Sequence, residues 1–476
     1  MKVNLPEPVA AVLSILTEAG HEAYVVGGAV RDLLIEASTK DWDFTTSAKP
    51  EEVVKLFPES FYDNSFGTVG ISGKHLLEIT ENKKTKDPIW STHGWLDQVY
   101  EITTFRKEYG YSNRRHPDKI VWGKTVEEDL ARRDFTINAM ALKNSSTLPK
   151  QKNGFVDITV EIIDPFDGQK DLDGKLIKAV GDPDERFRED ALRMMRAVRF
   201  GAQIGFVIEN DTLKAIKKNS SLINEVSWER ISQELLKIMG SDFAADGVTM
   251  LLNSGILEYI LPETLAMRNV PQAGRHKLDV WHHSLESLRE CPSTNPIVKL
   301  ATFLHDIGKP ISYREQGPRG ITFYGHEVVG ERIVRKISKR LRLSKKQTER
   351  LSTLVRWHMF TYDPKMTDAA IRRFIKRVGI ENINDMMLLR VGDRKGGGSK
   401  ATSWRLRELQ QRIGEQLYEP MTLRDLKVNG EDVMNELKIK PGRKVGEIMN
   451  VLFDEVMEDT SKNNKEYLLK RIKELG

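Results

Sequence analysis

Two aspartates separated by one residue, Asp41 and Asp43, stand in the segment DWDFTT. This segment alternates and is rich in β-forming residues, which predicts a strand over residues 41–46. Side chains at i and i+2 of a strand point to the same face, which would bring the two carboxylates together. Two such carboxylates can share a pair of Mg²⁺ ions that activate an attacking hydroxyl and stabilise a leaving pyrophosphate. A solvated strand edge would carry the same pattern, so the interpretation depends on its context.

A glycine pair precedes the aspartates. Gly27 and Gly28 lie in GGAVRD, between a predicted strand over 23–28 and a predicted helix. Glycines at this point let the backbone approach a phosphate, and a helix N-terminus favours an anion. Arg31 would fall in the first helical turn, within reach of a triphosphate. The alternative is an ordinary tight turn with an exposed arginine.

A second set of residues with metal-ligating chemistry lies in the C-terminal half. Its members are His283, His305, Asp306 and Asp393. Imidazole and carboxylate ligands suit Mn, Ni, Zn, Fe or Mg, so the identity of the metal stays open. A bound metal would activate water against a phosphoester. His326 and His358 lie between them in sequence and would permit a second metal, whereas a lone histidine on a helix is more often a core residue.

The elements that must position these residues differ between the two halves of the chain. Residues 8–19, 29–36 and 50–57 are predicted to be helices, and the segments FGTVGIS, HLLEIT and VYEITTFR are further strand candidates. This order predicts an α+β domain with one mixed or antiparallel sheet. Beyond about residue 182 strands nearly vanish and the patterns become helical. The segment 81–97 is polar and lacks periodicity, which indicates an inserted surface loop.

Composition limits the class of protein. The chain has 476 residues, from which we expect about three folded domains. Its hydrophobic fraction of 39% is typical of a globular protein. A net charge of +5 permits a polyanionic partner without demanding one. The single cysteine, Cys291, excludes a disulfide scaffold and a thiolate zinc cluster and is typical of a reducing compartment. The short apolar stretch near the N-terminus is far below the length of a membrane span, so we expect a cytoplasmic protein that binds no membrane.

The motifs together carry a family resemblance. The run GGAVRDLL…KDWDFTT resembles the head of the class II tRNA nucleotidyltransferases, the CCA-adding enzymes, which share a nucleotidyltransferase fold with DNA polymerase beta. EDLARRDFTINAMAL (128–142) and IIDPFDGQKDLDGKLIKAVGDPDERFREDALRMMRAVRFGA (162–202) follow in the family's order. The resemblance covers about 180 residues. It implies a polymerase-beta-like head with a mixed sheet, followed by an all-α neck and body.

The C-terminal half adds a second resemblance, because its H…HD…D pattern with LHDIGK is similar to the HD phosphohydrolase superfamily. Five parts are therefore expected: a catalytic head (1–160), a neck for nucleotide selection (161–225), a helical body (226–275), an HD domain (276–412) and a tail that contacts tRNA (413–476). The metals implied are Mg²⁺ at the head and an unidentified divalent ion at the HD site.

The resemblance also implies residue roles in the head. Asp41 and Asp43 would hold Mg²⁺, with Glu101 as the third carboxylate. Glu78 is a rival for that third position, because the 81–97 insertion separates two similar predicted strands. In RRDFTINAM, Arg133 would contact the incoming nucleotide. Asp134 beside it is suited to accept a hydrogen bond from a ribose hydroxyl; the alternative for both is a surface salt bridge.

The segment EDALRMMRAVR would supply base selection. Asp190 and Arg193 are three residues apart on a predicted helix and would share one face. A carboxylate beside a guanidinium can read the edges of cytosine and adenine while rejecting guanine and uracil. In the family this pair replaces a nucleic-acid template. Arg196 and Arg199 match positions that contact nucleotide or hold the template, and pairing on a surface helix is their alternative.

Other segments carry weaker signals. KEYGYSNRRHPD (107–118) resembles the loop that helps the family to switch from C to A addition, although it could equally be an ordinary hairpin loop. The basic segment 331–350 and the tail segment 421–458 are suited to a phosphate backbone. Trp90, Trp95 and Trp122 are interpreted as packing or anchoring residues rather than a base-stacking set.

The predicted activity is template-independent addition of CCA to the 3′ end of tRNA, with CTP, ATP and the tRNA acceptor arm as partners and a possible phosphohydrolase activity in the HD domain. A CC-only or A-only enzyme and a bacterial poly(A) polymerase are the alternatives that use the same head. A remote alternative is an RNA-binding HD hydrolase with an inactive head. The oligomeric state stays open.

Overall fold

A computed structural model describes residues 1–39, 41–63, 67–80, 88–111, 117–145, 150–152, 154–272, 278–316, 320–420 and 422–476. The chain divides into two compact units. The N-terminal unit comprises Met1–Glu234 and Thr249–Ile260, and the C-terminal unit comprises Leu235–Val248 and Leu261–Gly476. The finer division into five parts stays a prediction. Among the described residues, no helix is both long and apolar enough to cross a membrane.

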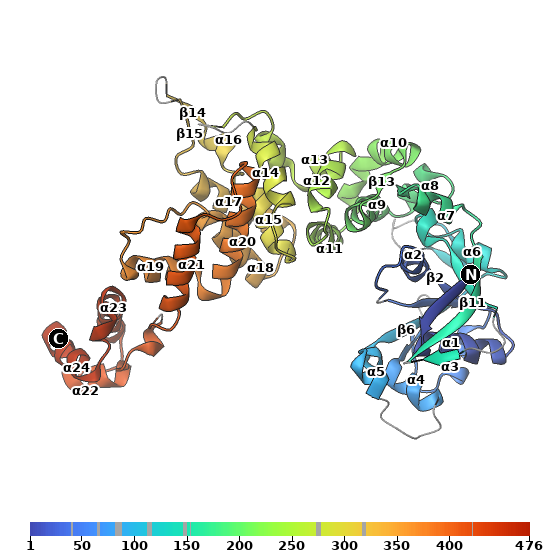
Figure 1. The fold of residues 1–476 in the computed structure, drawn as a ribbon, viewed down its shortest axis with the longest axis horizontal. Coiled ribbons are helices and arrows are strands. Elements are labelled where there is room, and N and C mark those ends of the chain that lie inside the picture. Colours follow the sequence, from blue (N-terminus) through green and yellow to red (C-terminus); the bar gives the residue numbers. More distant parts are fainter. Residues whose placement is uncertain are drawn as a thin grey trace. The chain divides into compact units, whose positions relative to one another are not determined.

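The N-terminal unit is built on one sheet, which has nine strands within the described residues (Figure 1). The order is β1-β11-β9-β2-β3-β6-β5-β4, with β10 beside β11. The strands are β1 (Lys2–Pro6), β2 (Ala23–Val26), β3 (Asp43–Thr46), β4 (Phe61–Asp63), β5 (Thr68–Ser72), β6 (Val99–Thr104), β9 (Ala141–Asn144), β10 (Lys150–Lys152) and β11 (Phe155–Ile163). β3 and β6 run parallel and the other pairs run antiparallel. The sheet is therefore mixed, and the α+β fold predicted for the head is confirmed.

Helices cover the sheet and close its core. They are α1 (Glu7–Glu18), α2 (Gly28–Leu34), α3 (Pro50–Leu56), α4 (Gly73–Thr80), α5 (Pro88–Thr92) and α6 (Val126–Leu130). α1 begins behind a proline and buries Val9, Leu13 and Leu16 in the same cluster as Phe44 of β3. Trp90 and Trp95 also join this core. Trp122 does not, because it is 40% exposed; it lies over Gly67.

The segment HLLEIT is a helix, so its prediction as a strand is wrong. β5 ends at Ser72, whose hydroxyl accepts a hydrogen bond from the His75 amide and so turns the chain into α4. Leu76 and Leu77 are adjacent and both buried. A strand would send them to opposite faces, whereas one side of a helix buries both. A segment of six residues, of which three are apolar, does not carry enough periodicity to separate these outcomes.

The remainder of the N-terminal unit is helical, as expected. Its elements are α7 (Gly168–Asp173), α8 (Pro183–Glu189), α9 (Leu192–Ile204), α10 (Asn210–Asn219) and α13 (Leu257–Ile260), with the short strands β12 (Leu176–Ile177) and β13 (Val207–Ile208). α11 (Trp228–Met239) and α12 (Ala244–Asn253) contribute residues to both units. Two residues, Asp190 and Ala191, separate α8 from α9, and this break affects the predicted selection residues.

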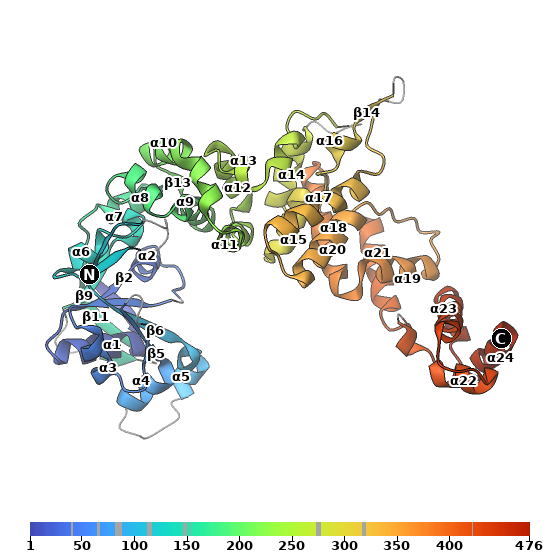
Figure 2. The same cartoon turned by 180° about the vertical axis from the view of Figure 1, so that it is seen from behind.

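The C-terminal unit consists almost entirely of helices (Figure 2). They are α14 (Val280–Arg289), α15 (Pro296–Leu304), α16 (Lys309–Ser312), α17 (His326–Arg340), α18 (Lys345–Trp357), α19 (Asp368–Val378), α20 (Ile380–Gly396), α21 (Trp404–Gln416), α22 (Gly430–Leu437), α23 (Arg443–Glu458) and α24 (Lys465–Leu475). The last three enclose a small core of their own that includes Leu452, Phe453 and Leu468. Beyond α13, the described strands are the two-residue β14 (Arg314–Glu315) and β15 (Ile321–Thr322).

Candidate active site and candidate metal centre

The register of the head sheet positions the first carboxylates. Asp43 opens β3, where it pairs with Val26 of antiparallel β2 and with Glu101 of parallel β6. Directly paired residues on neighbouring strands share a face of the sheet, so Asp43 and Glu101 lie side by side. Asp41 precedes the strand and is exposed. Its assignment to the strand is therefore wrong: β2 ends at Val26 and offers no residue to pair with it.

Glu101 and Glu78, the two candidates for the third head carboxylate, lie in different surroundings. Glu78 lies on α4, where it is exposed and groups with Glu59 and His75, with ligand atoms within 4.8 Å of one another. Glu101 instead lies in register with Asp43. The geometry therefore favours Glu101 over Glu78 as the third head carboxylate.

Asp43 lies in a crowded and charged setting. Burial raises the pKa of its carboxyl group, Arg133 opposes that shift, and Asp41 adds to it. Gly27 has φ +77°, and a Cβ built on it would lie 2.8 Å from Arg133 Nη1 and 3.6 Å from Asp43 Oδ2. Glycine is thus required both by the backbone conformation and by the close approach. Neighbouring carboxylates that disfavour each other's charge are suited to a divalent cation, such as the Mg²⁺ expected here from the sequence resemblance.

Arg31 is held by side chains of its own helix, of the 131–140 turn and of α9. Its Nη1 donates to Asn138 Oδ1 at 2.9 Å, and its Nε and Nη2 donate to Asp32 Oδ1 at 2.9 and 2.7 Å. Its guanidinium also lies over the Phe200 ring, 5.3 Å from the centroid. A bound triphosphate would have to compete with these partners.

Arg196 and Arg199 also surround the Phe200 ring, at 5.4 and 4.2 Å from its centroid. Arg196 donates to Asp134 Oδ2 at 2.6 Å, and Arg199 pairs with Glu234 at 3.3 Å. Burial raises the pKa of Asp134, but Arg196 and Arg193 outweigh it and hold the pKa below its ordinary value. Asp134 is therefore an ionised acceptor that joins the 131–140 turn to α9.

The predicted selection residues lie at a helix break rather than along one helix. Asp190 follows the last residue of α8 in an extended conformation, and its Oδ1 accepts from the Leu192 amide at 3.0 Å, at the start of α9. Asp190 Oδ2 pairs with Arg230 Nη2 at 2.7 Å, and Arg193 Nη1 pairs with Glu189 Oε2 at 2.6 Å. The expectation of one continuous helix face is wrong, because Asp190 is extended between α8 and α9 and belongs to neither helix. Each selection residue has its own partner.

In the C-terminal unit, helices that carry the predicted metal ligands pack closely at three glycines, Gly308, Gly392 and Gly396. Cβ atoms built on Gly392 and Gly396 of α20 would lie 2.6 and 2.4 Å from atoms of Ser287 on α14, and one on Gly308 would lie 2.0 Å from the His326 carbonyl oxygen. α14 can therefore approach α20, and the turn after α15 can approach the start of α17. These contacts bring together residues from five separate segments.

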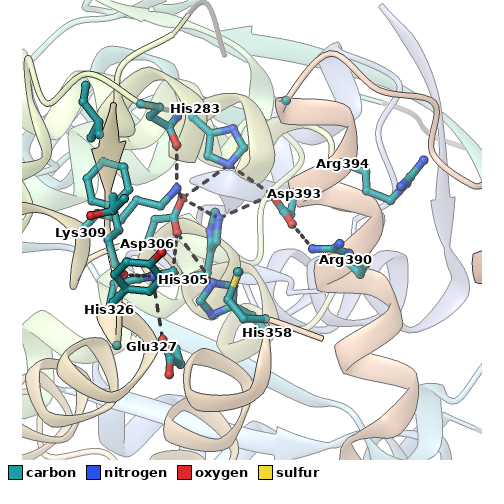
Figure 3. A pocket seen from close by; sticks show the side chains of 18 of the residues that line it. His283, His305, Asp306, Lys309, His326, Glu327, His358, Arg390, Asp393 and Arg394 are labelled. Carbon is teal, nitrogen blue, oxygen red and sulfur yellow. Dashed lines mark hydrogen bonds and ion pairs between the residues drawn. The ribbon is translucent and has the colours of Figure 1, made fainter. Parts of the chain in front are cut away.

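The cluster surrounds Asp306 (Figure 3). His283 and His305 place Nε2 at 3.7 and 3.2 Å from Asp306 Oδ2, and His326 and His358 place Nε2 at 3.3 and 3.7 Å from its Oδ1. Asp393 Oδ1 lies 3.2 Å from His283 Nε2. These ligands form two groups of three, each with ligand atoms within 4.8 Å of one another: His283, His305 and Asp393, and Asp306, His326 and His358.

The orientation of the imidazoles fits a metal. Nδ1 of His305, His326 and His358 lies 2.7 to 2.8 Å from a backbone carbonyl oxygen, so Nδ1 carries a proton and Nε2 faces the cluster. The Nε2 atoms of His326 and His358 face each other at 3.3 Å. Burial lowers the pKa of His358 to about 3, so its imidazole is neutral at pH 7. Two facing acceptors at this distance fit a cation between them.

A cavity of about 770 Å³ opens onto this cluster. Its lining includes Lys309, Arg390 and Arg394, together with Phe323, Tyr324 and Met359. Lys309 Nζ lies 2.6 Å from Asp306 Oδ2, and Arg390 Nη1 lies 2.8 Å from Asp393 Oδ2. The cavity combines cations, aromatic surface and the ligand cluster, which suits an anionic ligand.

Comparison with known proteins places this architecture. Residues 23–178 match the poly A polymerase head domain, residues 205–267 match the probable RNA and SrmB-binding site of polymerase A, and residues 328–472 match tRNA nucleotidyltransferase domain 2. The CCA-adding enzyme of Ligilactobacillus salivarius is 31% identical over 99% of this chain and 98% of its own. This chain belongs to the CCA-adding enzymes.

Other relatives agree with that family. The CCA-adding enzyme of Geobacillus kaustophilus is 40% identical over 53% of this chain, and the match spans 54% of that protein, so the chain aligns with about half its length. The crystal structure of the Bacillus stearothermophilus CCA-adding enzyme in complex with CTP has 25% identity and a TM-score of 0.66, with 98% of this chain and 97% of that one covered. The family predicted from the motifs is confirmed, and divalent metal use comes with it.

Sequence reasoning did not single out several residues that the structure brings to these sites. Arg230 pairs with Asp190 from 40 residues away, and Glu234 pairs with Arg199 from 35 away. No spacing in the sequence signals contacts at such separations. The Glu189–Arg193 pair, four residues apart, does follow the spacing of a helical ion pair. Part of the loop predicted over 107–118 lies outside the described residues, as does part of the 81–97 insertion.

Proposed function

We propose that this chain adds CCA to the 3′ end of tRNA from CTP and ATP by two-metal nucleotidyl transfer in its head. The observation that carries the proposal is the register that sets Asp43 beside Glu101, with Arg133 and Gly27 against Asp43. The relative from B. stearothermophilus binds CTP, and the family's name states the reaction. The tRNA acceptor arm is the proposed partner.

The residues divide into three roles in this proposal. Asp41, Asp43 and Glu101 hold Mg²⁺, which activates the tRNA 3′ hydroxyl and stabilises the pyrophosphate that leaves. Arg133 and Arg31 neutralise the triphosphate, and the absence of a Cβ at Gly27 and Gly28 lets both guanidinium groups lie against the backbone there. Asp134 orients the ribose by accepting from a hydroxyl group.

Base selection is proposed for Asp190 and Arg193. A carboxylate that accepts from the amino group of cytosine or adenine, beside a guanidinium that donates to a ring nitrogen, distinguishes these bases from uracil and guanine. Their present partners, Arg230 and Glu189, hold the two side chains at the helix break until a base shares their hydrogen bonds. Arg196 and Arg199 support this surface through Asp134 and Glu234.

An Asp43→Asn variant tests the head. It keeps the size of the side chain but removes a charge that the metal ions require, so we expect incorporation of CTP and ATP to fall at least a thousandfold while tRNA affinity stays within twofold. Asp173→Asn, an exposed position at the end of α7, is the matched control. Normal incorporation by Asp43→Asn would refute the assignment of the carboxylates.

We further propose that the C-terminal unit holds two divalent metals and hydrolyses phosphoesters. His283, His305 and Asp393 would hold one metal, and Asp306, His326 and His358 would hold the other. The observation that favours this second function is the pair of Nε2 atoms that face each other at 3.3 Å. Metal ions in such a site make bound water nucleophilic at neutral pH. Lys309, Arg390 and Arg394 would neutralise the phosphate.

Metal analysis and a phosphatase assay test this second function. The purified chain is expected to contain about two equivalents of transition metal, and His326→Gln is expected to lose about one. Release of p-nitrophenol from p-nitrophenyl phosphate should fall in parallel. A wild-type chain that holds no transition metal after loading with Mn²⁺, Ni²⁺ or Zn²⁺ would refute the centre. The incorporation assay reads the head independently.

A further inference from the structure

Arg132 lies between two buried carboxylates that come from different elements. Glu108 belongs to β7 (Arg106–Tyr109), and its side chain is 8% exposed; Asp129 belongs to α6 and its side chain is 0% exposed. Arg132 Nη1 donates to Glu108 Oε1 at 3.1 Å, and Arg132 Nε donates to Asp129 Oδ1 at 2.9 Å. Arg132 therefore ties β7 to the turn that follows α6.

Glu108, Arg132, Asp129 and Arg133 form a row of charged side chains, and further contacts extend it at both ends. Glu108 also accepts from Arg106 Nε at 2.8 Å and from the Tyr111 hydroxyl at 2.5 Å. On the other side, Asp129 Oδ2 lies 3.6 Å from Arg133 Nη2. The guanidinium of Arg133 in turn lies against the Gly27 backbone and close to Asp43.

The charges along the row alternate. Negative Glu108 and Asp129 each lie between positive groups, and Arg132 lies between the two carboxylates. Burial raises the pKa of Asp129, but Arg132 and Arg133 outweigh it and keep the carboxyl ionised. Removal of one charge from such a row leaves its neighbours buried without compensation. The row therefore fixes the position of each member through the next one.

The geometry at Asp129 divides its two oxygens between two arginines. Arg132 directs both Nε and Nη2 to Oδ1 at 2.9 Å. Oδ2 has no hydrogen-bond partner among the described residues and faces Arg133. Arg133 thus has a second carboxylate, Asp129, besides Asp43, and this ion pair limits where its guanidinium can lie.

We propose that Glu108, Arg132 and Asp129 are positioning residues that hold the Arg133 guanidinium against Gly27 and Asp43, in a fixed orientation toward the nucleotide triphosphate. The inference rests on the proposed function in taking Arg133 as a triphosphate contact. A guanidinium held in place before the ligand arrives loses less conformational freedom on binding. CTP and ATP carry the same triphosphate, so the row must affect both nucleotides equally, unlike a residue that reads the base.

Calorimetric binding of CTP and ATP to the full chain, in Mg²⁺ and without tRNA, tests the proposal. Glu108→Gln should raise the Kd of each nucleotide about tenfold, because Arg132 loses a charge-assisted bond and no longer holds Asp129 in place. Tyr111→Phe removes one neutral donor to the same carboxylate and should raise both Kd values about twofold to threefold. Tyr109→Phe is the control, because Tyr109 lies on the same strand and is 51% exposed.

Three outcomes distinguish this role from others. If Glu108→Gln lowers the melting temperature but leaves both Kd values within twofold, Glu108 is only structural and the proposal fails. A change for one nucleotide alone would also overturn it, since that marks a base-reading role. If the Glu108→Gln variant does not fold, Arg132→Lys replaces it in the test. This substitution keeps the charge but cannot bridge both carboxylates, so the Kd of CTP and the Kd of ATP should rise by the same factor. A wild-type chain that binds CTP without transferring it would refute the proposed function while the row remained testable.

Discussion

Substitution of Gly27 by alanine adds a single heavy atom, the Cβ, beside Arg133 and Asp43. The backbone at Gly27 has φ +77° and ψ −139°, a region that side chains other than glycine rarely adopt. We expect the strain to cost about 1–3 kcal/mol of the free energy of unfolding. The added Cβ would also lie 2.8 Å from Arg133 Nη1, so the guanidinium must move by several tenths of an ångström to about 1 Å.

The effect on activity should exceed the effect on stability. Arg133 and Asp43 both lie beside the new methyl group. A displacement of about 1 Å in such a group can cost about a hundredfold in rate. We therefore expect kcat/KM for addition of the first C to fall about a hundredfold, which corresponds to about 2.7 kcal/mol.

Gly20→Ala is the matched control for this substitution. Gly20 also has positive φ, +88°, at the end of α1, but a Cβ built there meets no heavy atom within 4 Å. Its strain should cost about 1–2 kcal/mol of stability with kcat/KM within twofold of wild type. Denaturant unfolding and single-nucleotide incorporation are measured on both variants. If Gly27→Ala loses no more activity than Gly20→Ala, the close approach of Arg133 to Gly27 is not part of the site.

Three further predictions concern other parts of the chain. Arg230→Ala removes the ion-pair partner of Asp190, which keeps the bond from the Leu192 amide. This should change the ratio of kcat/KM for CTP and ATP about tenfold, measured on tRNA that ends before C74 and on tRNA that ends at C75. Gly396→Ala places a Cβ 2.4 Å from Ser287 Oγ, which should push α14 from α20 and at least halve the metal content by mass spectrometry without slowing nucleotide incorporation. Burial lowers the folded-state pKa of His358 to about 3, below its ordinary 6.5, so the unfolded chain binds the proton first. The stability of the metal-free C-terminal unit should therefore fall as pH drops from 6.5 toward 3, and His358→Gln should flatten that slope in thermal unfolding.

The sequence predicted the fold class because its motifs follow one another in the family's order. Individual residues depended on facts that local patterns do not hold. The strand containing Asp43 was found from alternation, but its first residue was set by where β2 ends, so Asp41 fell outside it. The apolar pattern around Asp190 continues on both sides, so the helix break appears only in the structure, as the extended backbone of Asp190 and its bond from the Leu192 amide.

The C-terminal cluster was likewise predicted in part from the sequence and in part appears only in the structure. The resemblance of the H…HD…D pattern to the HD superfamily selected His283, His305, Asp306 and Asp393, and the structure brings these four side chains together. Their role as metal ligands stays a prediction. The division of these side chains into two groups around Asp306 could not be predicted from the sequence. It depends on which oxygen of Asp306 each imidazole faces, and only the structure shows this. Likewise, Arg132 is recognisable in sequence only as one member of a basic pair, whereas its two buried carboxylate partners appear once β7 meets α6.

The most direct test of the central claim is nucleotide incorporation by the purified wild-type chain with Mg²⁺. Three tRNA substrates are offered, one ending before C74, one ending at C75 and one complete, each with CTP, ATP or both. We expect addition of C, C and A to the first, of A alone to the second, and nothing to the third. Arrest after CC, addition of A alone, or an extended A tail would contradict CCA addition and identify one of the sister activities instead.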